Sequence, residues 1–212
     1  MAIGVEPGLR EQKKQRTRTL LIDAALELCD RQGFDQTTVD QIAALADVSP
    51  RTFSRYFATK EAVMLGFIDE LIELVALQLA EQPDDISDLE AVYRSHVLAF
   101  AKTKAAPTAR LTAERLLAST RIVTSSAALM NAMVEFRQDA VKAVLADRMG
   151  VDGDDPRLKL TAAVWGSIVV TALTQLAVAA DWETTTIDEI VGAIDHTYAE
   201  FLVVTGGARQ PA

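Results

Sequence analysis

Apolar residues recur every three or four positions along almost the whole chain, which is the spacing of one face of an α-helix. Leu21 and Leu28 belong to such a stripe within residues 11–32, and Gly33 follows where a helix commonly ends. Eight more helices are predicted, at residues 38–46, 49–57, 59–82, 89–106, 108–119, 125–149, 157–180 and 187–204. No Asn-Gly or Asp-Gly turn between alternating strands interrupts this pattern, so we predict an all-α protein of about nine helices.

Two short helices joined by a tight turn are predicted within residues 38–57. Thr38-Val39-Asp40-Gln41 matches a capping box, in which the first and last side chains bond free backbone N–H groups at a helix start. Asp47-Val48 forms the turn. Ser49 caps the second helix, and Pro50 occupies its first position, where a missing N–H costs nothing. This pattern is typical of a helix-turn-helix unit.

The second of these short helices separates an aromatic face from a polar one. Phe53, Tyr56 and Phe57 recur at i, i+3 and i+4, so they share a side that can pack against neighbouring helices. The side chains left outside are Arg51, Thr52, Ser54 and Arg55. A short, supported helix with a cationic outer face can enter the major groove, which makes double-stranded DNA the first candidate partner.

Charge is distributed unevenly along the chain. The 212 residues carry a formal net charge of -9, but residues 1–60 are balanced at +1 and residues 61–212 hold -10. The basic side chains that form a candidate DNA-contacting arm are Lys13, Lys14, Arg16 and Arg18. Because salt screens charges beyond roughly 8–10 Å, this local charge outweighs the acidic remainder at short range. A solvated N-terminal segment is the competing interpretation.

The rest of the composition narrows the class of protein. The most apolar stretch, residues 162–180, is interrupted by polar side chains, whereas a membrane span needs roughly 20 apolar residues, so no membrane association is predicted. A single cysteine, Cys29, cannot form an internal disulfide, and residues 1–9 lack the pattern of a signal peptide. Together these features favour a cytoplasmic protein.

An enzyme is the main alternative from another class. The sequence has no phosphate-binding loop, dinucleotide-binding glycine motif or Cys/His metal cluster, and it holds only two His and one Cys. We therefore predict no catalytic residues, no metal site and no cofactor. A helical adaptor, or a ligand sensor that does not bind DNA, is a further alternative, but it leaves the cationic helix unexplained.

Eight short pieces between residues 20 and 65 stand in one order and at one spacing. They are Ala24-Ala25, Gly33-Phe34, Thr37-Thr38-Val39, Ile42-Ala43, Ala46-Asp47-Val48-Ser49, Thr52-Phe53, Tyr56-Phe57 and Lys60-Glu61. In this arrangement they resemble the DNA-binding domain of the TetR family of bacterial transcriptional regulators. The family often has Gly at the position of Asp47, a residue that tolerates turn conformations. It often has Tyr at the position of Ser54, so the phosphate contact of that Tyr is weakened or lost here.

The resemblance implies a division of labour among the side chains that face DNA. The expected phosphate contacts are Thr38, Tyr56 and Lys60. The expected base-reading residues and their neighbour are Arg51, Thr52, Arg55 and Ser54. Lys60 lies in the first turn of its helix, where the dipole disfavours a cation, and a phosphate would resolve that conflict. For Lys60 a solvated side chain is the competing interpretation, and for Arg55 a phosphate contact or a surface ion pair.

The resemblance also divides the chain into domains. It implies an N-terminal arm and DNA-binding domain at 1–58, a ligand-binding and dimerisation domain at 59–206, and a flexible tail at 207–212. The helices at 157–180 and 187–204 are expected to form a homodimer interface, because one short helix reads only a few base pairs. The competing interpretation is that the apolar stripes of these two helices pack only inside the same chain.

The apolar bias of residues 61–150 favours a hydrophobic or lipid-like small-molecule effector. The predicted ligand-binding residues are Phe67, Leu71, Phe100, Arg115, Leu116, Met133, Phe136, Arg137, Trp165 and Ile168. Each apolar one can equally belong to the core, and each charged one to the surface. We predict a transcriptional regulator, in the simplest case a repressor that leaves a palindromic operator when the effector binds.

Overall fold

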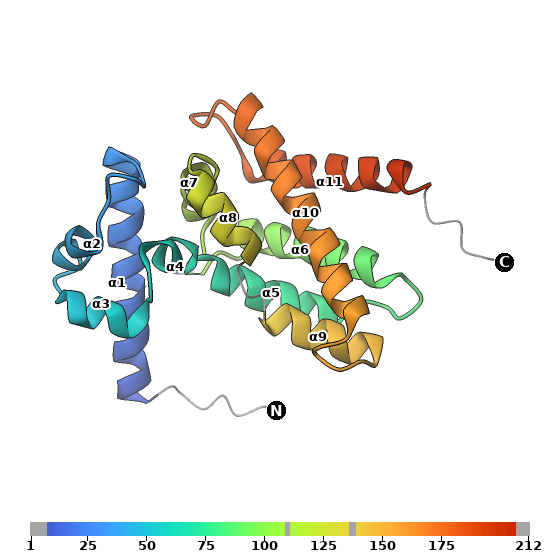
Figure 1. Ribbon diagram of the computed structural model, residues 1–212, viewed down its shortest axis with the longest axis horizontal. Helices are drawn as coiled ribbons and strands as arrows, with labels where there is room; N and C mark the ends of the chain where they lie inside the picture. The colour runs from blue at the N-terminus through green and yellow to red at the C-terminus, as the bar shows by residue number, and fades with distance from the viewer. Residues whose placement is uncertain (1–7, 109–110, 136–138, 207–212) are drawn as a thin grey trace. The chain divides into compact units, whose positions relative to one another are not determined.

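The computed structural model describes residues 8–108, 111–135 and 139–206, and these parts of the chain form eleven α-helices and no strand (Figure 1). The helices are α1 (Leu9–Gln32), α2 (Val39–Leu45), α3 (Pro50–Tyr56), α4 (Lys60–Leu65), α5 (Ile68–Ala80), α6 (Asp88–Ala105), α7 (Ala113–Thr124), α8 (Ala127–Glu135), α9 (Asp139–Met149), α10 (Pro156–Ala179) and α11 (Ile187–Val204). The predicted all-α fold is confirmed. The predicted tail at 207–212 lies outside the described residues.

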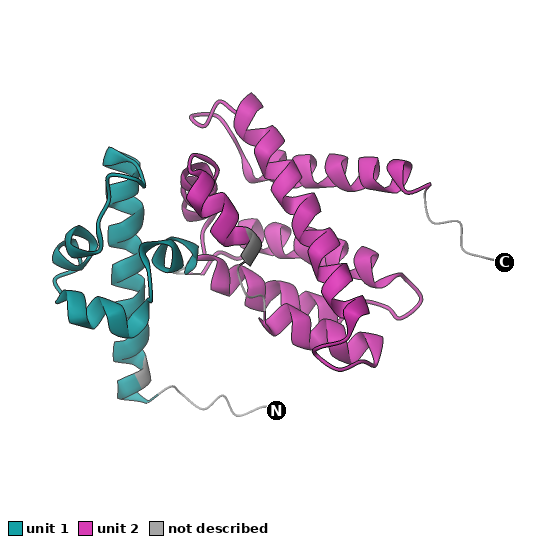
Figure 2. Cartoon of the chain, in the orientation of Figure 1, with its two compact units in different colours: residues 1–66 teal, residues 67–212 magenta. Residues whose placement is uncertain are grey.

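Two compact units divide the chain, residues 1–66 and residues 67–212 (Figure 2). Unit 1 contains α1 to α4, and unit 2 contains α5 to α11. The division falls after α4, whereas the domain boundary expected from the sequence precedes α4. The reason is that α4 packs against α1, so it belongs to the same unit.

The core of unit 1 draws one large apolar residue from each of its four helices. Leu21, Ile42, Phe53 and Val63 are almost completely buried. α1 packs against α2 and α4, and α2 packs against α3. Burial of a side chain of this size contributes roughly 1.5–3 kcal/mol, so tertiary packing holds α3 in place although it is only seven residues long.

Side-chain caps fix the ends of α2 and α3. Thr38 Oγ1 accepts the Gln41 N–H at 3.2 Å, and Gln41 Oε1 accepts the Thr38 N–H at 2.9 Å. Ser49 Oγ accepts the Thr52 N–H at 3.1 Å. Asp47 has φ of 53° in the turn between the helices, a left-handed conformation that Asp tolerates better than most residues. The predicted turn and caps are therefore present.

The single helix predicted at 59–82 is wrong, because the chain forms α4 and α5 with a break at Gly66. The Gly66 N–H bonds the Val63 carbonyl oxygen at 3.2 Å, so the last turn of α4 tightens. A Cβ atom at position 66 would lie 2.9 Å from the Phe57 ring and 3.1 Å from an Arg18 nitrogen. Crowding by these two side chains explains why glycine stands at the break.

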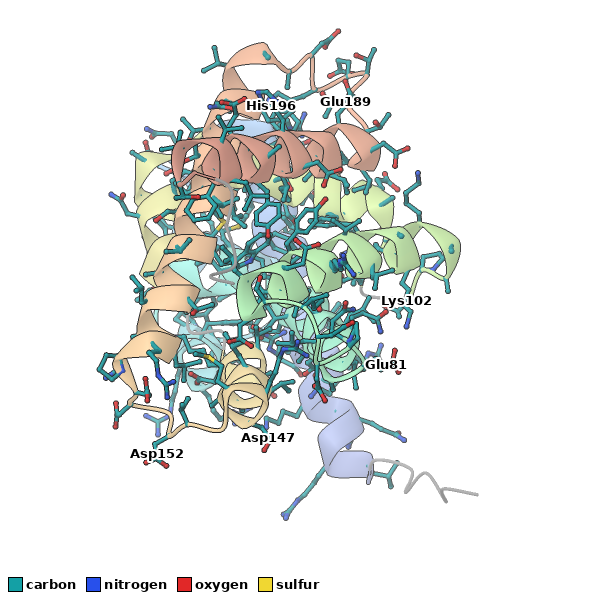
Figure 3. All side chains as sticks on the ribbon, turned by 90° about the vertical axis from the view of Figure 1, so that its right-hand side faces the viewer. Glu81, Lys102, Asp147, Asp152, Glu189 and His196 are labelled. Atoms are coloured by element: carbon teal, nitrogen blue, oxygen red, sulfur yellow. The ribbon has the colours of Figure 1, made fainter. Side chains whose placement is uncertain are left out.

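Unit 2 is a helical bundle whose outside is acidic. α5 packs against α6 and α9, and α10 packs against α11. Figure 3 shows charged side chains on its outer faces, among them Glu81, Asp147 and Asp152, and all three are exposed. Apart from Glu61 in α4, the negative balance of residues 61–212 therefore lies on a unit that contains neither α2 nor α3.

α10 and α11 keep apolar side chains on their outer faces. Leu160 and Val178 of α10 are 65% and 88% exposed, and Val203 and Val204 of α11 are 72% and 83% exposed. Among the described helices, α10 alone is long and apolar enough to cross a membrane, contrary to the expectation that no stretch is. Length and composition alone are weak evidence for a membrane span, because the core helix of a soluble protein passes the same test.

Candidate functional site

The outer surface of α3 presents most of the side chains predicted to face DNA. Arg51, Ser54 and Arg55 are exposed, and Thr52 and Tyr56 are half-buried. The Arg55 guanidinium lies over the Tyr56 ring, 5.3 Å from its centroid. Ser54 Oγ donates to the carbonyl oxygen four residues earlier at 3.1 Å, which leaves it only as an acceptor. The donors that α3 offers to a groove are therefore mainly its two arginines.

Thr38 stands at the start of α2, but its hydroxyl is already used in the cap. Thr38 Oγ1 lies 3.2 Å from the backbone nitrogen of Gln41 and 3.2 Å from its Oε1. The first turn of α2 still has backbone N–H groups without a partner inside the helix. An anion at this end would meet those groups rather than the Thr38 hydroxyl.

Lys60, a predicted phosphate contact, is bonded within unit 1. Its Nζ donates to the carbonyl oxygens of Phe34 at 3.0 Å and Thr37 at 3.2 Å. The same ammonium lies 4.1 Å from the centroid of the Phe34 ring. These contacts stabilise the cation in the first turn of α4, so no phosphate is needed to offset the unfavourable helix dipole. They also hold the segment between α1 and α2 that leads into the Thr38 cap.

The predicted basic arm is part of α1, and its cations do not all point the same way. Lys13, Lys14 and Arg16 are exposed. Arg18 instead donates from Nη1 to the Gly66 carbonyl oxygen at 3.1 Å, and its guanidinium carbon lies 5.1 Å from the centroid of the Phe57 ring. Arg18 is therefore held inside unit 1, whereas the other three side chains lie on its surface.

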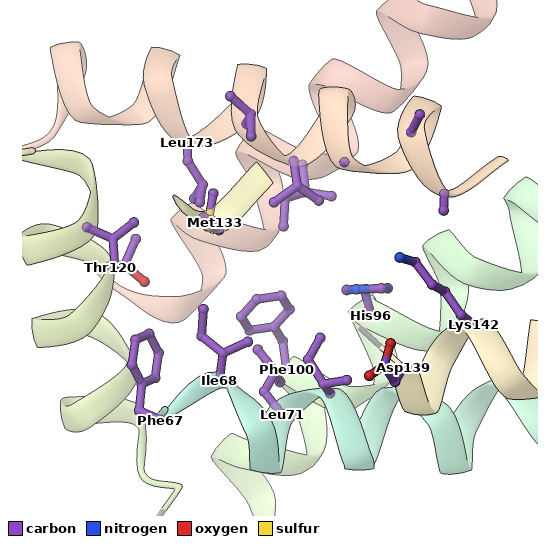
Figure 4. A pocket seen from close by; sticks show the side chains of 18 of the residues that line it. Phe67, Ile68, Leu71, His96, Phe100, Thr120, Met133, Asp139, Lys142 and Leu173 are labelled. Atoms are coloured by element: carbon purple, nitrogen blue, oxygen red, sulfur yellow. The ribbon is translucent and has the colours of Figure 1, made fainter. Parts of the chain in front are cut away.

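Unit 2 contains a cavity of about 490 Å³ (Figure 4). Its wall is mainly apolar and comes largely from α5, α6, α7, α10 and α11. The predicted ligand-binding residues that line it are Phe67, Leu71, Phe100, Leu116 and Met133. Cavities of this size, with few polar groups, are typical of sites for small organic molecules.

Other predicted ligand-binding residues do not line this cavity. Trp165 and Ile168 are buried beside it, and Arg115 is half-buried outside its wall. Phe136 and Arg137 lie outside the described residues. The α10 residues that do line the cavity are Leu158, Lys159, Ala162, Ala163, Gly166, Val169, Val170 and Leu173. Ala162, Ala163 and Gly166 have small side chains at helical spacing, which leave room for a ligand, and that is the signal which sequence reasoning missed.

Charged groups enter the wall from α9 and from the start of α10, and a hydroxyl enters it from α7. Asp139 and Lys142 of α9 line it beside His96, as Figure 4 shows. Asp154 and Lys159 also line it and form an ion pair with a 2.9 Å Nζ–Oδ1 distance. The Thr120 hydroxyl donates to the Leu116 carbonyl oxygen at 2.8 Å, so only its lone pairs are left for a ligand.

His96 is fully buried in the wall, and both ring nitrogens already have partners. Nδ1 lies 2.8 Å from the Val92 carbonyl oxygen, and Nε2 accepts the Trp165 indole N–H at 3.1 Å. Desolvation lowers the pKa of His96 to about 4, and the bond to Val92 opposes this only in part. His96 is therefore a neutral part of the wall with its proton on Nδ1.

Comparisons with known proteins agree with this organisation. Residues 21–66 match the family model of bacterial regulatory proteins of the tetR family. The HTH-type transcriptional regulator TcmR of Streptomyces glaucescens is 34% identical over 152 residues, which cover 70% of this chain and 67% of that protein. The HTH-type transcriptional repressor NicS of Pseudomonas putida is 28% identical over 90 residues, 42% of each chain.

Among solved structures, Thermus thermophilus FadR is a TetR family transcriptional repressor whose structure contains lauroyl-CoA. It is 22% identical to this chain, covers 92% of it with 97% of its own length, and superposes with a TM-score of 0.50. At this identity the likeness shows the fold alone.

The fold and the cationic surface of α3 define a helix-turn-helix DNA-binding protein. The chain belongs to the TetR family of bacterial regulatory proteins. It is a transcriptional regulator that binds operator DNA and acts as a homodimer. The relatives are regulators rather than enzymes, and neither they nor the family match supports the alternative of a helical adaptor.

Proposed function

We propose that this regulator is a repressor that leaves a two-fold operator when an apolar small molecule with a hydrogen-bonding head group enters the cavity of unit 2. The observation that carries the effector class is the wall, which is apolar over α5, α7 and α10 and polar beside α9. Burial of apolar ligand surface contributes about 25 cal/mol per Å² to the binding free energy. A polar group buried against the apolar wall without a hydrogen-bond partner weakens binding. A lipid-like molecule satisfies both conditions.

The head group would lie near Asp139 and Lys142, because these are the exposed charged side chains of α9 in the wall. They carry opposite charges, so a head group that both donates and accepts hydrogen bonds is matched there. His96 contributes shape rather than a hydrogen bond, since its two nitrogens are already bonded.

Release from DNA would follow from linkage between the cavity and the dimer helices. Leu173 of α10 and Ile190 and Ile194 of α11 line the cavity, while other side chains of the same helices are exposed for a second copy. A ligand that fits one arrangement of these helices better shifts the population toward that arrangement. In a dimer α3 of each copy is the recognition helix, and a changed spacing between the two recognition helices weakens their simultaneous contact with both half-sites.

On the DNA side, Arg51 and Arg55 are the proposed base-reading residues, with Thr52 beside them. The exposed cations of α1 and the first turn of α2 supply the proposed phosphate contacts, and residues 1–58 with α4 packed against them form the proposed DNA-binding domain. A protein that acts on bacterial operator DNA belongs in the cytoplasm, which is where we place it.

The effector class is tested by calorimetric titration with chain-matched aliphatic alcohols, carboxylates and amines. We expect saturable binding of at least one aliphatic series to the full chain, and weaker binding in a Leu173→Trp variant, whose larger side chain narrows the cavity. Binding of small, highly polar compounds alone would contradict the proposal. Release is tested with a duplex selected by the protein from a random pool. An effector that binds without changing affinity for that duplex would refute release.

A further inference from the structure

Arg18 connects two parts of unit 1 that matter for DNA binding. Its guanidinium donates to the carbonyl oxygen of Gly66, the C-cap of α4, and lies over the ring of Phe57, the C-cap of α3. A planar cation can form both contacts at once, because the hydrogen bond lies in the plane of the group and the ring lies against its face. Arg18 therefore joins the end of the recognition helix to the break between α4 and α5.

Phe57 carries this connection into α3. Its ring lies 6.0 Å from that of Phe53, the buried anchor of the recognition helix, and its own side chain is 6% exposed. Its backbone N–H bonds the Phe53 carbonyl oxygen at 3.0 Å. A shift of the Phe57 ring is therefore passed to the helix that carries Arg51 and Arg55.

Gly66 links the Arg18 contact to the start of unit 2. A Cβ atom at this position would meet Phe57 Cε1 at 2.9 Å, Arg18 Nη2 at 3.1 Å and the Val63 carbonyl oxygen at 3.2 Å. The next residue, Phe67, lines the cavity of unit 2. One peptide bond thus separates a cavity residue from the carbonyl group that Arg18 holds.

The geometry points to Arg18 as a positioning residue for the recognition helix, held by Gly66 and Phe57, and not as a phosphate contact of the basic arm. It sets the position of the α3 C-terminus according to the position of the Gly66 carbonyl group. The inference rests on DNA binding by α3 and is independent of which effector the cavity takes.

The test compares variants of the full chain on two duplexes, one selected by the wild-type protein from a random pool and one of random sequence. Affinity is measured over a range of salt concentrations. The variants are Arg18→Met, Arg18→Lys and Gly66→Ala, and Arg16→Met is the control for an exposed cation on the same helix. Circular dichroism and the thermal midpoint check that each variant is folded.

We expect Arg18→Met and Gly66→Ala each to weaken binding to the selected duplex roughly tenfold, as removal or displacement of a stacked, hydrogen-bonded guanidinium implies. Neither should change the slope of log affinity against log salt. Arg18→Lys should not restore binding, because it keeps the charge but not the planar group. Arg16→Met should weaken binding to both duplexes and lower the slope of log affinity against log salt by about one.

Two results would overturn the inference. In the first, Arg18→Met lowers the salt slope and Arg18→Lys restores it, which would make Arg18 a phosphate contact. In the second, folded Gly66→Ala and Arg18→Lys proteins bind the selected duplex as the wild type does. If Arg18→Met does not fold, Gly66→Ala and Arg18→Lys still test the inference. Gly66→Ala changes no charged residue, and Arg18→Lys keeps the positive charge. Failure to select any sequence would instead count against specific DNA binding itself.

Discussion

His96 shows how burial sets the charge of a single residue. Its Nε2 accepts the Trp165 indole N–H at 3.1 Å, so a proton added there would face another donor. Burial lowers the pKa of His96 to about 4 from its usual 6.5. The side chain is therefore neutral in the folded protein at pH values where the unfolded chain already binds a proton.

A pH dependence of stability follows from this shift. Above pH 6.5 neither state binds the extra proton and the full free energy of unfolding is present. Between pH 6.5 and about 4 only the unfolded chain binds it, so stability falls as pH falls. The loss in the free energy of unfolding is at most roughly 3 kcal/mol.

Denaturant unfolding at pH 7 and pH 4.5 measures this loss of stability. The loss should be smaller in His96→Asn than in the wild type, whereas His196→Asn, at an exposed position, should behave as the wild type. An equal loss in all three proteins would contradict a buried neutral His96.

Lys60 has a structural role that its position in the sequence does not reveal. Replacing it with Met removes two hydrogen bonds to carbonyl oxygens and a contact with the Phe34 ring. We expect a loss of about 1–3 kcal/mol in the free energy of unfolding, measured by denaturant titration. An equally stable Lys60→Met protein with a lower salt slope for DNA binding would show that Lys60 acts mainly on phosphates.

Arg51 is the residue whose role on DNA is most open to a direct test. It is exposed in the first turn of α3. If it reads a base, Arg51→Ala should weaken binding to the selected duplex by about 1–3 kcal/mol more than binding to random DNA. Fluorescence anisotropy with both duplexes measures this difference. Equal losses on the two duplexes would place Arg51 among the phosphate contacts.

At the scale of helices, Arg148 joins the end of α9 to the segment between α5 and α6. Its guanidinium donates to the carbonyl oxygens of Gln82 at 3.1 Å, Pro83 at 2.7 Å and Ile86 at 3.0 Å. Nε also lies 3.2 Å from Asp88 Oδ1. The side chain is only 9% exposed, so water cannot solvate its charge. The bonds to the carbonyl oxygens and to Asp88 take the place of that hydration.

Substitution of Arg148 should therefore be costly. Arg148→Met leaves three carbonyl oxygens and the Asp88 carboxylate without this partner, and we expect a loss of about 3–5 kcal/mol in stability. Arg31 forms an exposed ion pair with Glu27, so Arg31→Met should cost under about 1 kcal/mol. Thermal unfolding of both variants tests the contrast. A similar midpoint for the two variants would mean that the Arg148 bonds do not hold the helices.

At the scale of the whole molecule, the exposed apolar faces of α10 and α11 are where a homodimer interface is expected. Val178→Asp places a charge on this face and should weaken self-association without unfolding the chain, because Val178 is 88% exposed. Leu77→Asp on α5, also at a largely exposed apolar position, should leave the dimer intact. Analytical ultracentrifugation measures both, and dissociation by Leu77→Asp alone would move the interface to another face.

Local signals in the sequence were sufficient for the all-α fold and for the Thr38 and Ser49 caps. Helical periodicity and capping act over a few residues, so they can be read without knowing the rest of the fold. The helix-turn-helix and its exposed arginines follow from the same local signals.

Tertiary structure decided what the cations and the apolar residues contact. Sequence spacing cannot show that Arg18 reaches Gly66, that Lys60 reaches the α1–α2 segment, or that Val169 rather than Trp165 lines the cavity. These outcomes depend on which helices meet and on the rotation of each helix about its axis. Packing sets both through contacts between residues far apart in sequence.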